Sequence, residues 1–564
     1  MAGFAVCHIS QAGRSYVKGE SQGTGNSQEE VLTFFPRPIF FLFFFSLMAS
    51  FFSCSREPEI KRPNSITIGS TADAKRLIPL LATDSASGDI SGWLYNGLTK
   101  YDKNIHVTGD LAESWVISPD GLQITFYLKK DVLWHDGVEF TADDVLFTYK
   151  TAIDPKIPTP YSSNFGPVKT VELIDKYAIK VSYTEPFAPA LESWGMGILP
   201  KHILDGKDIT NEYYNRNPIG TGPYKLKEWV TGQKVVIEAF ENYFEGKPRI
   251  DKFIVRVIPD NATMFLELKF GGIDFMGLTP PQYKLQAGTE FFNKHFQKFK
   301  YPSFGYTYLG YNLLDPRFSD KRVRQAITYG INKKDIIAGV LLGYGTPCTG
   351  PFPPESWAYN PDVRDPGYSP EKSRALLEDA GWKKGKSGFI EKDGKPFEFT
   401  VLVNQGNDSR LKTAQIMKEN LKEIGIKMNI KVLEWQAMLH DFIDKKRFEA
   451  IIMGWALSRD PDMYDIWHSS KTKEGEFNFI SFKNKEVDGL LLEGRRTFDF
   501  EKRKSIYRRI HEILSEEQPY TFLYVPDALP VLHKRFKGVE KAPIGIWHDF
   551  IHWHVPKNRI EWHE

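Results

Sequence analysis

The chain has 564 residues, of which 41% are hydrophobic and 26% are charged, a composition typical of a soluble globular protein with more than one lobe. Basic residues number 73 and acidic residues 71, and there is no long run of one sign, which excludes nucleic acid as an expected partner. The three cysteines, Cys7, Cys54 and Cys348, are too few and too scattered for a disulfide framework or a zinc knuckle.

A short apolar segment near the N-terminus predicts export. Residues 39–52 are almost entirely apolar, and they follow Arg37 and precede Ser53 and Cys54. The run is too short to span a bilayer comfortably, and its arrangement resembles a bacterial lipoprotein signal. We therefore expect a leader over 1–53 and lipid attachment at Cys54, which would hold the protein at the membrane, in the periplasm or another extracytoplasmic part of the cell envelope.

Two features of this region leave alternatives open. A plain secretory signal or a single membrane anchor, with Cys54 incidental, also places the body outside the cytoplasm. Residues 1–30 are polar and unlike the start of a signal peptide, so we expect translation to begin near Val31 or Leu32. Residues 54–65 are expected to form a tether.

From Ile66 onward, strand-like alternation and helix-like periodicity take turns, which predicts an α/β fold. Helices are expected over 323–329, over 336–342 after an Asn332 cap, and from Ser369–Pro370 to Gly381. The clearest unit is a strand over 397–403, a helix capped by Asp408, and a strand over 427–432. Strand, helix and strand with short joints favour a βαβ crossover with a parallel strand pair.

Two conspicuous motifs are interpreted as architecture. Trp134-His135-Asp136-Gly137 follows an alternating strand and suits a tight turn, in preference to a catalytic His–Asp pair. Gly220-Thr221-Gly222-Pro223 is rich in glycine but lacks the lysine and the following helix of a phosphate loop, so nucleotide binding is not expected. No catalytic residue is assigned.

Several segments, in order across residues 66–530, resemble the family 5 extracellular solute-binding proteins, the oligopeptide, dipeptide and nickel-binding components of ABC importers. The most specific block is 111–150, which contains Ser114-Trp115, Asp120-Gly121, Trp134-His135-Asp136-Gly137 and Thr141-Ala142-Asp143-Asp144-Val145. The other segments are GTGPYKLKEW from Gly220, YNLLDPRFSDKRVRQAITYGINKKDII from Tyr311 and GWALSRDPDMYDIWHSS from Gly454.

The resemblance implies a two-lobed periplasmic-binding-protein fold of the class II type with an additional third domain. Lobe I would combine 66–105, 196–305 and 527–564, domain II would cover 106–195, and lobe III would cover 308–525. The implied protein is a monomer without enzymatic activity or cofactor, which captures a peptide ligand between two closing lobes and delivers it to a permease and ATPase complex.

The resemblance also places the ligand site, at Gly454, Trp455, Ala456, Ser458 and Asp460. In the family's peptide binders an aspartate three residues after the tryptophan pairs with the ligand's ammonium, and here that position holds Ser458. Either Asp460 replaces this aspartate or the ligand has no free amino terminus; as alternatives, Trp455 is a core residue and Asp460 a turn residue. Tyr95, Tyr306 and Tyr308 are further candidates for cleft aromatics, against a role in packing.

Other classes remain open. In the C-terminal segment HDFIHWH, His548, Asp549 and His552 have the spacing of a helical zinc motif, but the same residues fit a strand with the histidines on one face. No metal site is assigned. The same fold could bind a metal chelate, haem or a small glycan, and a surface lipoprotein without a transport role is a third possibility.

Overall fold

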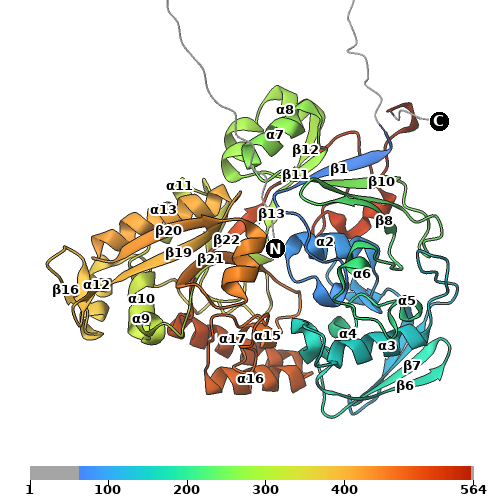
Figure 1. Cartoon of the computed structure of the whole chain (residues 1–564), viewed down its shortest axis with the longest axis horizontal. Helices are drawn as coiled ribbons and strands as arrows, with labels where there is room; N and C mark the ends of the chain where they lie inside the picture. Colours follow the sequence, from blue (N-terminus) through green and yellow to red (C-terminus); the bar gives the residue numbers. More distant parts are fainter. Residues whose placement is uncertain (1–62, 560–564) are drawn as a thin grey trace, which may run out of the picture. The chain divides into compact units, whose positions relative to one another are not determined.

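The computed structural model describes residues 63–559, so the apolar run 39–52 and Cys54 lie outside the described residues. Within the described part, three larger β-sheets are joined by helices and loops (Figure 1). No helix in this part is both long and apolar enough to cross a membrane.

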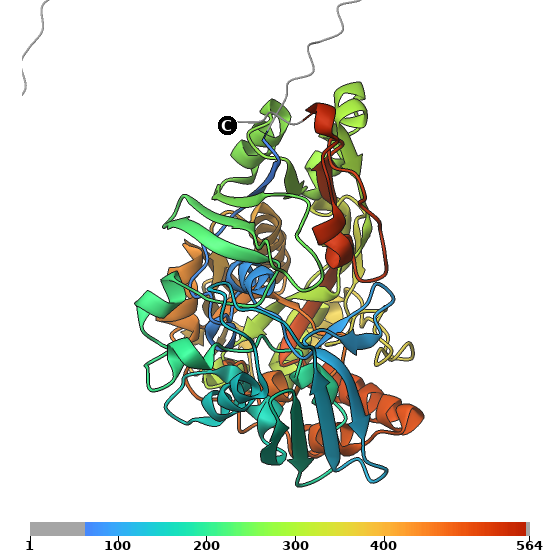
Figure 2. The same ribbon diagram turned by 90° about the vertical axis from the view of Figure 1, so that its right-hand side faces the viewer.

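The first sheet has seven strands and brings the two ends of the described chain together. Its strand β1 (Ser65–Ser70) pairs in parallel with β10 and β11. Figure 2 shows the C-terminal segment, in red, running alongside this part of the molecule. Arg535 holds the junction, because its guanidinium donates to Asp274 and to the carbonyl oxygens of Pro63 and Ser65. In spatial order the strands are β12 (Phe296–Lys298), β23 (Pro530–His533), β11 (Phe275–Gly277), β1, β10 (Lys252–Val257), β9 (Lys234–Ala239) and β8 (Tyr224–Val230).

The second sheet is antiparallel and has four strands. Its spatial order is β4 (Ala112–Ile117), β5 (Gln123–Leu128), β7 (Ala178–Tyr183) and β6 (Val168–Asp175). Helix α3 (Ala142–Ile153) packs against it and begins with a capping box between Thr141 and Asp144. The short helices η2 (Pro160–Phe165) and α4 (Ala190–Ser193) follow in the same region.

The third sheet has helices on both faces, which buries its central strands. Residues of α10 (Lys321–Tyr329), α11 (Lys333–Gly339), α12 (Pro370–Asp379) and α13 (Asp408–Glu423) join one apolar core, and those of α15 (Tyr464–Trp467), α16 (Lys485–Arg496) and α17 (Phe500–Glu517) join another (Figure 1). The strand order is β13 (Tyr301–Pro302), β22 (Tyr520–Ala528), β14 (Gly305–Tyr311), β21 (Ala450–Ala456), β19 (Glu398–Asn404) and β20 (Lys427–Leu433), with β15 (Gly345–Pro347) also paired to β22.

The expected unit of strand, helix and parallel strand is present as β19, α13 and β20, and the two strands pair in parallel over their whole length. Two local predictions were wrong. Asn407, not Asp408, caps α13, and α11 ends at Gly339 instead of Leu342. At the start of α13 both neighbouring residues can cap a helix, so local chemistry alone could not choose between them, whereas α11 ends before Val340, three residues ahead of the expected glycine stop at Gly343.

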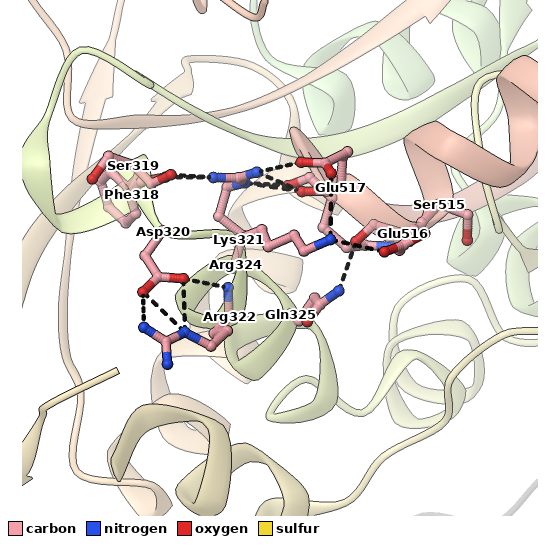
Figure 3. A network of polar contacts seen from close by, with 11 residues as sticks. Phe318, Ser319, Asp320, Lys321, Arg322, Arg324, Gln325, Ser515, Glu516 and Glu517 are labelled. Carbon is pink, nitrogen blue, oxygen red and sulfur yellow. Dashed lines mark hydrogen bonds and ion pairs between the residues drawn. The ribbon is translucent and has the colours of Figure 1, made fainter. Parts of the chain in front are cut away.

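A buried arginine joins the helices α9 (Pro316–Ser319) and α10 to the end of α17. Arg324 is 4% exposed, and its guanidinium donates to the carbonyl oxygens of Phe318, Ser319 and Glu517 (Figure 3). These carbonyls lie where helices end and lack partners within the helix, so one planar cation satisfies several acceptors at once.

The remaining elements are short and connect these layers. They are η1 (Pro79–Leu81), α2 (Ser85–Leu94), β2 (Thr99–Tyr101), β3 (Val107–Gly109), α5 (Lys201–Leu204), α6 (Glu212–Arg216), α7 (Asn261–Phe270), η3 (Gln282–Gln286), α8 (Glu290–His295), β16 (Lys383–Lys384), β17 (Ile390–Lys392), β18 (Lys395–Pro396), α14 (Trp435–Ala437), η4 (Met438–Ile443), η5 (Trp547–His552) and η6 (Lys557–Arg559).

Candidate ligand-binding site

A cavity of about 790 Å³ lies between segments that are far apart in the sequence. One wall comes from β21 and the chain after it, through Ile466, together with the start of β14. A further part of the lining comes from the start of α2, from η2 and from α4. A volume of this size is typical of enclosed ligand sites.

Most of the residues proposed from the sequence are brought together here. Gly454, Trp455, Ala456, Ser458, Asp460 and Tyr306 all line this cavity. Tyr95 lines a second cavity instead. Tyr308 lines neither cavity; it is fully buried and stacks on Tyr520 with ring centroids 3.9 Å apart.

Strand β21 presents an open backbone edge to the cavity. Its pairing with β14 continues from Ala450 to Ala456, but its pairing with β19 on the other side covers only Ala450 and Ile451. Residues 453–456, which have no ladder partner on that side, line the cavity. An extended ligand backbone could therefore add to this edge.

Aromatic side chains build part of the wall beside this edge. The ring of Trp455 lies 5.5 Å from that of Phe477 and 6.0 Å from that of Phe479, and its Nε1–H donates to the Tyr520 hydroxyl at 3.4 Å. Tyr306 is 2% exposed, and its hydroxyl has no hydrogen-bond partner within the described residues.

Asp460 is held by an ion pair. Nη1 and Nη2 of Arg503 donate to its two carboxylate oxygens at 2.6 and 2.7 Å, and the two side chains are only 16% and 9% exposed. A bidentate pair of this kind already neutralises the carboxylate. Asp460 is thus poorly placed to act as the free acid that a ligand ammonium would need.

The cavity is strongly acidic, but most of its acids have partners. Arg495 binds Asp462 through Nη2 at 2.7 Å, and Lys471 lies 3.2 Å from Asp465. The cavity-lining acids are Asp84, Glu192, Asp444, Asp460, Asp462, Asp465 and Glu476, against the bases Lys75 and Arg410.

Glu192, on α4, has no cationic partner among residues 63–559 within ion-pair distance. Its Oε2 accepts from the Tyr101 hydroxyl at 2.8 Å and from the backbone N–H of Asp460 at 3.2 Å. Burial, followed by the negative charges of Asp460 and Asp462, raises the pKa of Glu192 to about 8.

Arg410 is the corresponding cation without an acid in the described chain. Its Nη1 donates to Asn404 Oδ1 at 2.8 Å, and burial lowers the pKa of its guanidinium. A Cβ on Gly454 would lie 3.1 Å from Arg410 Nη2, so the glycine leaves the space that the guanidinium occupies beside β21. This position makes Arg410 available to a carboxylate from the cavity side.

The turn motif at His135 is structural. The backbone N–H of Gly220 donates to His135 Nδ1 at 3.1 Å, so the ring proton is on Nε2, which donates to the carbonyl oxygen of Gly222 at 3.0 Å. Asp136 instead contacts His202, at 2.8 Å. His135 therefore joins the two motifs of the sequence to each other and forms no dyad with Asp136.

The C-terminal HDFIHWH segment is neither a long helix nor a strand. Residues Trp547–His552 form the 3₁₀ helix η5, kinked at Asp549, and His552 Nδ1 lies 2.5 Å from Asp549 Oδ1. His548 and His552 line the second cavity, of about 770 Å³, with Tyr95. Within 63–559, no group of three or more His, Cys, Asp or Glu side chains has the geometry to hold a metal ion.

Sequence reasoning missed Glu192 and Arg410, the two charged cavity residues that we single out because neither has an ion-pair partner within residues 63–559. Neither belongs to a motif with a recognisable spacing. The sequence held one indirect indication. Position 458 is a serine where an aspartate was expected, so an acid that pairs with a ligand ammonium would have to come from another segment.

Comparisons with known proteins agree on one family. The model of the bacterial extracellular solute-binding proteins, family 5 Middle, matches residues 106–477. The oligopeptide-binding protein AppA of Bacillus subtilis (strain 168) is 36% identical over 504 residues, which is 87% of this chain and 92% of that protein. Heme-binding protein A of Haemophilus influenzae is 29% identical over 492 residues, covering 83% of this chain and 88% of that protein.

Solved structures agree with this relationship. The structure of AppA from Bacillus subtilis in complex with a nonapeptide matches with a TM-score of 0.83 at 34% identity, over 88% of this chain and 100% of that one. The crystal structure of NikZ from Campylobacter jejuni in complex with Ni(L-His) matches with a TM-score of 0.80 at 30% identity, over 87% and 99% of the two chains. This chain belongs to the bacterial extracellular solute-binding proteins of family 5, and it has that family's α/β fold.

Proposed function

We propose that this chain is the extracytoplasmic substrate-binding component of an ABC importer, without enzymatic activity, and that it captures oligopeptides or dipeptides and delivers them to a permease and ATPase complex. The observation that carries the peptide assignment is the open edge of β21 at residues 453–456, which lines the cavity. A strand edge binds an extended backbone whatever its side chains are, which suits capture of many peptides. The similarity to AppA, named as an oligopeptide-binding protein, supports the same assignment.

The proposal includes the arrangement expected from the sequence. The two lobes and third domain, with the boundaries given above, would close about a hinge onto the ligand, and the protein would act as a monomer. Cys54 would carry a lipid that holds the protein at the membrane. Incorporation of a labelled fatty acid into the wild-type protein but not into a Cys54→Ser variant would support the anchor, and equal labelling of both would contradict it.

The ligand assignment is tested by mass spectrometry of the cargo. Residues 55–564 are expressed as a secreted protein, purified without peptide-containing medium in the final steps, gently denatured, and the released small molecules are identified. We expect a set of short peptides. A single metal chelate, such as the Ni(L-His) bound by NikZ, or a haem would contradict peptide capture and assign this chain to another ligand class of the same family.

A further inference from the structure

The charges of the cavity wall fall into two groups. Along the segment after β21, Asp460, Asp462 and Asp465 are bound by Arg503, Arg495 and Lys471, which are cations of the same part of the chain. Within residues 63–559, Asp84 has no ion pair but caps α2: its carboxylate accepts hydrogen bonds from the backbone N–H and the hydroxyl of Ser87. These acids are satisfied by the protein itself and need nothing from a ligand.

Glu192 differs from them in both partners and position. Its neighbours are two further acids, and its hydrogen bonds come from a phenol and a backbone amide, neither of which supplies a positive charge. Because it accepts from the N–H of Asp460, its carboxylate lies against the same short segment that holds Ser458. A carboxylate from α4 therefore lies beside the segment in which Ser458 stands where an acid was expected.

Besides Asp84, which caps α2, Asp444 is a further cavity-lining acid without an ion pair in the described residues, but its surroundings differ from those of Glu192. Burial raises the pKa of Asp444, and the nearby charge of Lys75, which also lines the cavity, acts in the opposite direction. Asp444 therefore has a counter-charge in its own neighbourhood, and it provides a matched control for Glu192.

Arg410 supplies the opposite charge on the β21 side. Its guanidinium lies beside Gly454, and within residues 63–559 the neutral side chain of Asn404 is its only polar side-chain partner. The buried hydroxyl of Tyr306, which comes from the neighbouring strand and lines the same cavity, also has no partner in the described chain. An unpaired guanidinium and an unsatisfied buried hydroxyl are costly in a closed protein, so both indicate a polar ligand.

We propose that the cavity recognises a zwitterionic ligand, with Glu192 receiving its ammonium group and Arg410 receiving its carboxylate. The inference rests on the proposed function, because it assigns these groups to the two termini of an unmodified peptide. A guanidinium suits a carboxylate through two parallel hydrogen bonds, and an acid surrounded by other acids favours a cation over any neutral group.

The test measures which peptide ends the protein distinguishes. The probe is a synthetic pool of short peptides built from Ala, Leu, Phe and Ser, which carry no charged side chains, prepared with free ends, with acetylated amino ends and with amidated carboxyl ends. Binding by the wild type, Glu192→Gln, Arg410→Gln and Asp444→Asn is measured by capture and mass spectrometry, after circular dichroism has shown that each variant is folded.

We expect the wild type to prefer free peptides over either blocked form by about tenfold or more, since hydrogen bonds to charged groups are the stronger ones. Glu192→Gln should lose the preference against acetylation and keep that against amidation, and Arg410→Gln should show the reverse. Asp444→Asn should keep both preferences. Arg410→Lys should recover part of the preference against amidation that Arg410→Gln loses, because lysine restores the positive charge but not the two parallel donors of the guanidinium.

Each contrary result has its own meaning. Equal binding of free and blocked peptides by the wild type would overturn this inference and leave peptide capture intact. Retention of the amino-end preference by Glu192→Gln, or of the carboxyl-end preference by Arg410→Gln, would overturn the role of that residue. Failure of the folded wild type to bind any peptide form would overturn the proposed function, and the inference with it.

Discussion

The ion pair between Asp460 and Arg503 makes a prediction that separates structure from ligand binding. Replacing Asp460 by Ala would leave the Arg503 guanidinium, which is 9% exposed, with a hydrogen bond to the carbonyl oxygen of Gly494 but without its acid. Loss of one partner of a buried pair costs about 3–5 kcal/mol, a large part of a typical total stability of about 5–15 kcal/mol. We therefore expect the free energy of unfolding of Asp460→Ala to fall by about that amount.

Urea unfolding followed by circular dichroism measures this loss, and a double-mutant cycle isolates the pair. Arg503→Met combined with Asp460→Ala removes both charges, so the double variant should lose much less stability than the two single variants together. If Asp460→Ala is too unstable to purify, Asp460→Asn keeps the shape and can be compared in the same cycle. An Asp460→Ala protein of unchanged stability, with peptide affinity reduced tenfold, would refute the reasoning and make Asp460 a ligand residue.

Three further predictions follow from named contacts. Gly220→Ala should destabilise the protein by at least about 1–3 kcal/mol, because the added Cβ would lie 1.8 Å from the backbone carbonyl oxygen of Leu94; an unchanged thermal midpoint would contradict this. Burial lowers the pKa of His135 from its ordinary 6.5 to about 4, so its stabilising effect is complete above pH 6.5 and is lost as the pH falls toward 4, by about 3 kcal/mol. The stability of His135→Asn should fall less steeply over that range, and parallel curves for the two proteins would count against the assignment. Finally, binding of a free-ended peptide at pH 7 should release protons, since the raised pKa of Glu192 would fall beside an ammonium; calorimetry in buffers of different ionisation enthalpy should detect the release in the wild type and not in Glu192→Gln.

The parts of the fold that the sequence predicted best are those determined by neighbouring residues. Strand β19, helix α13 and strand β20 follow from alternation, periodicity and a glycine stop, all within one segment. The C-terminal segment at Trp547 could not be assigned in this way, because its histidines have a spacing that fits a helix and also a strand. Its 3₁₀ conformation accompanies the packing of Trp547 and Phe550 on Trp93 and Phe253, which lie far away in the sequence.

The site shows the same division between local and distant information. The segment from Gly454 to Asp460 was predicted through a motif, and the structure places it along the cavity. The partner of Asp460 was not predictable, because Arg503 lies 43 residues further on and on a different element, α17. Glu192 and Arg410 were missed for a related reason: whether a charge has a partner depends on which segments meet, and a single sequence does not show this.

The distribution of paired and unpaired charges bears on how a ligand would favour the proposed closure of the two lobes. Asp460 and Asp462 keep their arginines within one part of the chain, so their charges are balanced before the walls meet. Glu192 comes from α4, and bringing it against Asp460 without a ligand either places two carboxylates together or requires Glu192 to take up a proton, as its raised pKa indicates; both oppose closure of an empty cavity. A ligand ammonium placed between the walls reverses the sign of that interaction, since it attracts the acids on both sides. Differential affinity of this kind is what a ligand needs to shift a conformational equilibrium, and the proposed mechanism therefore locates it in Glu192 more than in the paired acids around it.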